Sequence, residues 1–204
     1  MHDDIRRALG SVAADLWGAP PKKTPAAPES APAAVSAPPL ERLWVSADET
    51  VDWTEVLAHD EPTDGLTSPE SWTLYRRYAH QVLSGDPESY LAVLKAADPL
   101  KDLTPWAEKF DVACVDANTL RVVFSALPAL TEREGRRYIA GMALRIARDL
   151  FALLPVLQVE ITALCGDKQL MRLPCERAEL QKVRFGFINP VEFAMQCGAF
   201  FDED

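Results

Sequence analysis

The sequence is poor in the residues that most often build enzyme centres. Its 204 residues include only three histidines and four cysteines, and no two cysteines form a CxxC pair. Glycine-rich phosphate-binding motifs, the zinc-binding HExxH and the GxSxG nucleophile turn are all absent from it. We therefore expect no catalytic residue, no metal site and no cofactor of a recognisable type.

The cysteines also lack a pattern that predicts disulfides. Cys165 and Cys175 flank an expected hairpin turn at 166–167, where Cys165 faces Lys168 and Cys175 faces Gln158, so the two thiols do not meet. Free buried thiols indicate a reducing compartment. The sequence shows no signal peptide and no apolar run of the ~18 residues that a membrane span needs. We expect a cytoplasmic protein without a membrane partner.

Positive charge is scarce, and the negative charge is concentrated in one segment. The formal net charge is −10, and residues 24–66 alone carry nine acidic and one basic side chain. An acidic chain of this kind does not indicate general binding to nucleic acid.

The N-terminus combines a short apolar helix with a proline-rich tether. Residues 1–17 predict an amphipathic helix, followed at 18–39 by a linker in which seven of 22 residues are proline. That composition favours a semi-extended chain without a core. The apolar face of the helix is made by Ile5, Leu9, Val12 and Leu16, with Trp17 at its end. We interpret it as a docking motif for a protein partner; the alternative is that it packs on its own domain.

Two further segments precede the main domain. Residues 40–66 are acidic but contain Trp44 and Trp53, which we expect to anchor the segment to the fold because exposed tryptophans are costly. Residues 67–110 predict a helical subdomain, with a helical hairpin whose two helices start at Ser68-Pro69-Glu70 and Asp86-Pro87-Glu88.

From Asp111 onward the hydrophobic period changes from that of helices to that of strands. Residues 111–204 predict the order β-β-α-β-β-α, which a four-stranded sheet with one long helix across it satisfies. The expected fold class is therefore α+β, with an N-terminal helical hairpin packed against this C-terminal domain.

The long helix is expected over 131–154, with Thr131 as its N-cap, Glu134 completing a capping box and Pro155 closing it. Arginines line its side opposite the main apolar face, and Arg133, Arg137, Arg145 and Arg148 are candidates for binding an anion. The alternative is that this arginine stripe meets the chain's own acidic residues 41–66.

The run ALRIARDLFALLP, followed by two strands and LQKVRFGFINPVEF, resembles the C-terminal part of bacterial cytosolic proteins of uncharacterised function. The resemblance covers roughly residues 135–197. It implies a genuine domain there and supplies no chemistry.

These features favour a non-enzymatic protein–protein interaction module, an adaptor or assembly factor that contacts its partner through residues 2–17. A second hypothesis is a nucleic-acid-associated protein that uses the arginines of the long helix. A third is an enzyme whose site is not recognisable from one sequence.

Overall fold

The computed structural model describes residues 39–63, 65 and 67–202. By its contacts the chain divides into Met1–Val35 and a compact unit, Ser36–Asp204. The predicted docking helix at 1–17 and all but the last residue of the linker at 18–39 lie outside the described residues.

After the 3-10 helix η1 (Leu40–Arg42) come three α-helices, each after an N-cap of the expected chemistry. They are α2 (Trp53–Ala58), α3 (Pro69–Leu83) and α4 (Pro87–Ala97). The side chains of Asp52, Ser68 and Asp86 accept hydrogen bonds from backbone N–H groups of the first turns, and proline occupies the start of α3 and α4. The two predicted start signals of α3 and α4 are therefore confirmed. Proline suits the first turn of a helix because its missing N–H would have no helical hydrogen-bond partner there.

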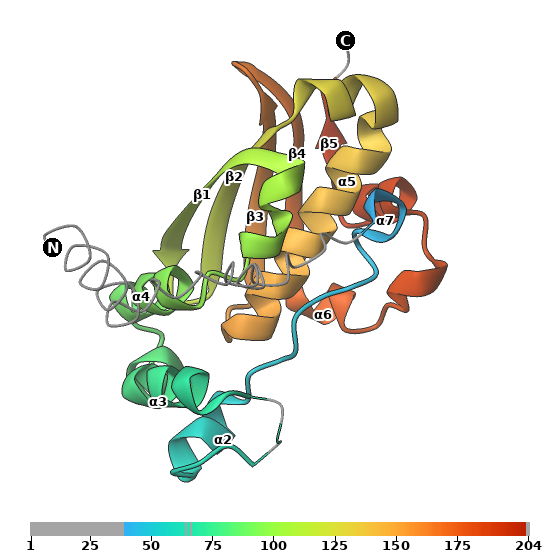
Figure 1. Cartoon of the computed structure of the whole chain (residues 1–204). Coiled ribbons are helices and arrows are strands. Elements are labelled where there is room, and N and C mark those ends of the chain that lie inside the picture. The colour runs from blue at the N-terminus through green and yellow to red at the C-terminus, as the bar shows by residue number, and fades with distance from the viewer. Residues whose placement is uncertain (1–38, 64, 66, 203–204) are drawn as a thin grey trace, which may run out of the picture. The chain divides into compact units, whose positions relative to one another are not determined.

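The sheet has five strands rather than the predicted four. In spatial order they are β1 (Ala107–Asp116), β2 (Thr119–Ala126), β3 (Gln158–Cys165), β4 (Lys168–Glu176) and β5 (Phe200–Phe201). β2 and β3 run parallel, and the other neighbours are antiparallel. The fifth strand was missed because two residues cannot show a period-two pattern. The boundary predicted between residues 110 and 111 falls inside β1 (Figure 1).

A bulge changes the register of the β3–β4 hairpin. Cys165 pairs with Lys168 as predicted, but Ala163 pairs with Met171 and Leu164 with Gln169, so one β4 residue is left over. Cys175 consequently lies opposite Val159, and the expected pairing with Gln158 is wrong. A bulge of this kind shifts every pair beyond it by one residue.

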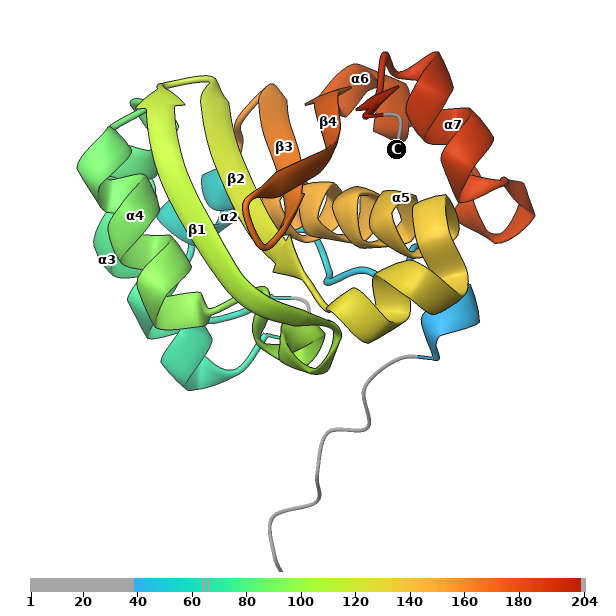
Figure 2. The ribbon, with the colours of Figure 1, turned by 90° about the horizontal axis from the view of Figure 1, so that it is seen from above.

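The long helix α5 (Pro128–Leu153) lies across one face of the sheet, with short helices α6 (Arg177–Leu180) and α7 (Pro190–Gln196) beyond β4 (Figure 2). It begins at Pro128 after Leu127, so Thr131 is not its N-cap; the Thr131 hydroxyl instead donates to the Leu127 carbonyl oxygen. Gly135, with φ of +54°, interrupts the helical backbone. This left-handed conformation suits glycine.

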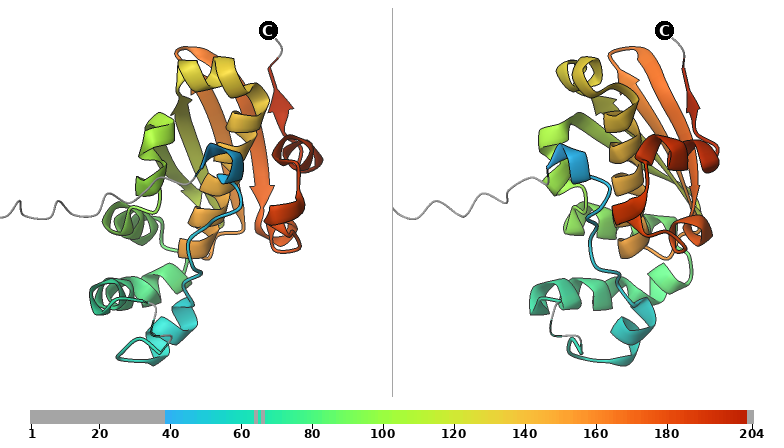
Figure 3. Two further views of the ribbon diagram at one scale, coloured as in Figure 1. Left: turned by 45° about the vertical axis from the view of Figure 1, so that its right-hand side comes forward. Right: turned by 90° about the vertical axis from the view of Figure 1, so that its right-hand side faces the viewer.

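Residues 40–53, which we call the strap, run beside α5 toward its C-terminal end (Figure 3). Trp44 packs on Gly141, where an added Cβ would come within 3.0 Å of the indole ring. The Trp53 indole N–H donates to the Leu153 carbonyl at 2.6 Å. Both tryptophans are buried, which confirms that they anchor the acidic segment.

Ile146 lies at the centre of the buried α5 face, and its side chain is fully buried. The Ile146→Asp variant should lose cooperative folding, because a carboxylate there has no water and no partner. Circular dichroism during thermal unfolding measures this. Ala129→Asp adds the same side chain at an exposed position near the start of α5 and should fold normally. A normal transition in both variants would contradict the packing of α5.

Candidate functional site

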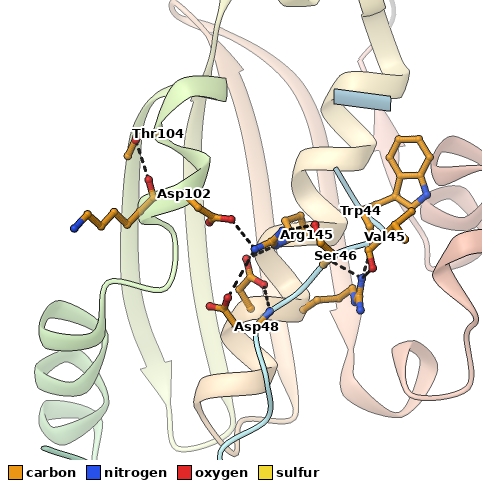
Figure 4. Close-up of polar contacts among 10 residues, drawn as sticks. Trp44, Val45, Ser46, Asp48, Asp102, Thr104 and Arg145 are labelled. Atoms are coloured by element: carbon orange, nitrogen blue, oxygen red, sulfur yellow. Dashed lines mark hydrogen bonds and ion pairs between the residues drawn. The ribbon is translucent and has the colours of Figure 1, made fainter. Parts of the chain in front are cut away.

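One buried guanidinium gathers groups from three separate parts of the chain (Figure 4). Arg145 Nε donates to Asp149 Oδ2 at 2.6 Å, and Nη2 donates to Asp102 Oδ2 at 2.8 Å. Nη1 donates to the Ser46 hydroxyl at 2.7 Å, and Asp48 Oδ1 lies 3.8 Å from Nη2. Arg145 and Asp149 belong to α5, Asp102 to the 3-10 helix η2 (Lys101–Trp106), and the other two to the strap. We call this set the Arg145 cluster.

The cluster follows from the spacing of two charged residues on one helix. Arg145 and Asp149 are four residues apart, so they lie one above the other on the same face of α5. Their side chains are 4% and 0% exposed. Ionised groups this deeply buried need partners, and the strap supplies them: the Asp48 N–H donates to Asp149 Oδ1 at 3.0 Å.

Arg148 holds the strap one helical turn further along. Its Nη1 donates to the carbonyl oxygens of Trp44, Val45 and Ser46 at 2.6, 2.8 and 3.1 Å. The guanidinium carbon lies 4.0 Å from the centre of the Phe185 ring, within reach of a cation–π contact. Arg145 and Arg148 together bind this part of the strap through its backbone and its side chains.

Three acidic side chains surround the one guanidinium of the cluster. Burial raises the pKa of Asp149 to about 7, against the opposing attraction of Arg145. Burial also raises the pKa of Asp48, which Arg145 again opposes. The stability of the contact between the strap and α5 therefore depends on pH.

The predicted site residues separate into three groups. Ile5, Leu9, Val12, Leu16 and Trp17 lie outside the described residues. Arg133 is exposed and bonds its neighbour Glu134 at 2.9 Å, and Arg137 stacks on Trp44.

Arg145 bonds internal groups through all three of its nitrogens, which corrects the expectation that it is available to an external anion. The alternative expectation was that the arginine stripe contacts the chain's own acidic residues 41–66. It describes Arg145 and Arg148, because both contact residues 44–48.

The sequence reasoning missed Asp102, Asp149 and Arg177. The four-residue spacing of Arg145 and Asp149 was visible, but it reads equally well as a surface pair. Asp102 gave no signal, because its approach depends on the folding of η2 against α5. Arg177 donates through Nε to the Val156 carbonyl and through Nη2 to that of Phe151, near the end of α5.

Within the described part of the chain, no group of three or more His, Cys, Asp and Glu side chains is placed to hold a metal ion. No helix in those ranges is both long and apolar enough to cross a bilayer. Comparison of the chain with protein-family models, with curated proteins and with solved structures found no match.

The Arg145→Met variant should lower the free energy of unfolding by about 3–5 kcal/mol, because it leaves the buried Asp149 carboxylate without a cation. Urea unfolding measures this loss. The matched control is Arg121→Met, which breaks the Arg121–Glu160 pair on the exposed sheet face and should cost less than about 1 kcal/mol. Equal small losses in the two variants would show that the Arg145 cluster does not stabilise the fold.

The raised pKa of Asp149 predicts a specific pH dependence. The unfolded aspartate titrates near 3.8 and the folded one at about 7, so between these values only the folded protein holds the proton. The contribution of Asp149 to stability is therefore full below about pH 4 and declines as the pH rises toward 7.

The Asp149→Asn variant should show a flatter pH dependence of stability over that window than the wild type, measured by urea unfolding. Asp60→Asn, at a side chain that is 90% exposed, should keep the wild-type dependence. A wild-type slope in the Asp149→Asn variant would contradict the raised pKa.

Proposed function

We propose that this protein is a protein–protein interaction module, an adaptor or assembly factor that docks through an apolar helix at residues 2–17. The compact unit would serve as the base from which the helix and its proline-rich tether extend. This function is non-enzymatic and needs no cofactor.

The observation that carries the proposal is the anchoring of the strap. Residues 18–39 lead directly into the strap, and Leu43 and Trp44 are buried only four and five residues after Pro39. Arg148 then binds three successive carbonyl oxygens, and Arg145 binds Ser46. A tether fixed firmly at one end limits the volume that its other end searches, which raises the local concentration of an attached docking motif.

The apolar helix suits a transient contact. Ile5, Leu9, Val12 and Leu16 form a stripe about 16 Å long at ~1.5 Å per residue. Burial of four such side chains contributes a few kcal/mol at ~25 cal/mol per Å². The tether's reach of some tens of Å allows the helix to find a groove on a neighbouring protein.

The nucleic-acid hypothesis has weaker support. Two of the four candidate arginines bind groups inside the compact unit, Arg133 pairs with Glu134, and the chain as a whole carries a net charge of −10. Phosphate contacts would need those charges facing outward.

The docking helix is tested with paired aspartate substitutions. The Leu9→Asp and Leu16→Asp double variant should lose its protein partner in affinity capture from source cells, followed by titration with the purified partner. Its thermal midpoint should match that of the wild type. The control is Ser11→Asp with Ala14→Asp, which adds the same charge to the opposite face of the helix and should retain binding.

The opposite pattern would overturn the docking role. If the Leu9 and Leu16 substitutions lower the thermal midpoint by several degrees while partner binding persists, these residues belong to the core of the protein.

A further inference from the structure

A pocket of about 270 Å³ opens between the strap, α5 and α6. Two arginines line it, Arg148 from α5 and Arg177 from α6, together with the aromatic rings of Phe151 and Phe185 and with Gln181. The cations come from residues far apart in the sequence, and each is held in place by contacts described above.

Arg148 presents its paired N–H edge without a protein partner. Its Nη1 makes all three of the hydrogen bonds to the strap carbonyls, and no group in the described residues accepts from Nε or Nη2. These two nitrogens form the edge that binds both oxygens of a carboxylate or phosphate at once. The Phe185 ring, 4.0 Å from the guanidinium carbon, supports its plane.

Arg177 is fixed in a similar way. Its Nε and Nη2 donate to the carbonyl oxygens of Val156, Phe151 and Leu154 at the C-terminal end of α5, and its guanidinium carbon lies 4.9 Å from the Phe151 ring centre. Among the described residues nothing accepts a hydrogen bond from Nη1. Its Nη1 group is thus a second donor on a side chain that lines the same pocket.

Neither guanidinium has a counter-ion within salt-bridge distance in the described ranges. Burial lowers the pKa of both arginines, which reflects the cost of two charges removed from water. Asp48 also borders the pocket, but its carboxylate is 3.8 Å from Arg145 Nη2 and its N–H is bonded to Asp149. A bound anion would add a direct counter-ion to two guanidinium groups that donate only to carbonyl oxygens in the described residues.

We propose that this pocket binds a compact oxyanion, a phosphate group or a carboxylate, through the Nε/Nη2 edge of Arg148 and the Nη1 group of Arg177. The fixed guanidinium planes make the site selective for planar or tetrahedral oxyanions over halides. The pocket volume of about 270 Å³ accommodates one anionic group and its immediate substituents. The inference is independent of the docking helix, since it rests only on residues of the compact unit.

The test uses the full-length protein and two probes, inorganic phosphate and N-acetyl-aspartate N-methylamide, titrated at constant ionic strength with chloride as the balancing anion. Isothermal titration calorimetry and the thermal midpoint are followed for each probe. At least one of them should bind saturably and raise the midpoint as its concentration increases. Binding of phosphate alone identifies a phosphate ligand, whereas binding of the aspartate analogue identifies a side-chain carboxylate.

The decisive variant is Gln181→Glu, which places a carboxylate on the pocket wall and leaves the structural hydrogen bonds of both arginines untouched. It should weaken binding by at least about tenfold through repulsion of the probe and competition for the arginines. Gln81→Glu makes the same charge change on exposed α3 and should bind like the wild type. The proposal is overturned if neither probe binds saturably, or if both variants bind as the wild type does.

Discussion

The burial of the Arg145 guanidinium together with the Asp149 carboxylate is the constraint on which the packing of the strap depends. Arg145 and Asp149 of α5 are both buried, so their charges are tolerable only when the surrounding chain supplies hydrogen bonds. The strap provides Ser46 and the backbone of Asp48, and η2 provides Asp102. Two separate segments, the strap and η2, are thereby fixed to α5 by electrostatics as well as by apolar contact.

This arrangement connects the fold to the proposed function. The strap is the part of the compact unit nearest in sequence to the tether, and Arg148, which binds it, also lines the pocket proposed for an oxyanion. Arg148 contributes to both, because its Nη1 group bonds the strap and its side chain lines the pocket.

Much of the fold was predictable from local signals. The starts of α3 and α4 depend on residues close in sequence, Ser68-Pro69 and Asp86-Pro87, and so does the change to a hydrophobic period of two. The anchoring of Trp44 and Trp53 depends on the burial of large side chains. Features set by distant contacts were not predictable: the pairing of β5, the bulge in β4 and the approach of Asp102 to Arg145. The start of α5 was misplaced because Thr131 imitates an N-cap within a helix that Pro128 has already begun.

Amide hydrogen exchange of the strap tests the central claim most directly. The Asp48 N–H donates to Asp149, and the Val51 N–H donates to the Ala152 carbonyl at 2.8 Å. If the Arg145 cluster makes the strap part of the core, both amides should exchange as slowly as those of α5, through global unfolding. Rapid exchange at Asp48 and Val51 while the α5 amides stay protected would contradict the account.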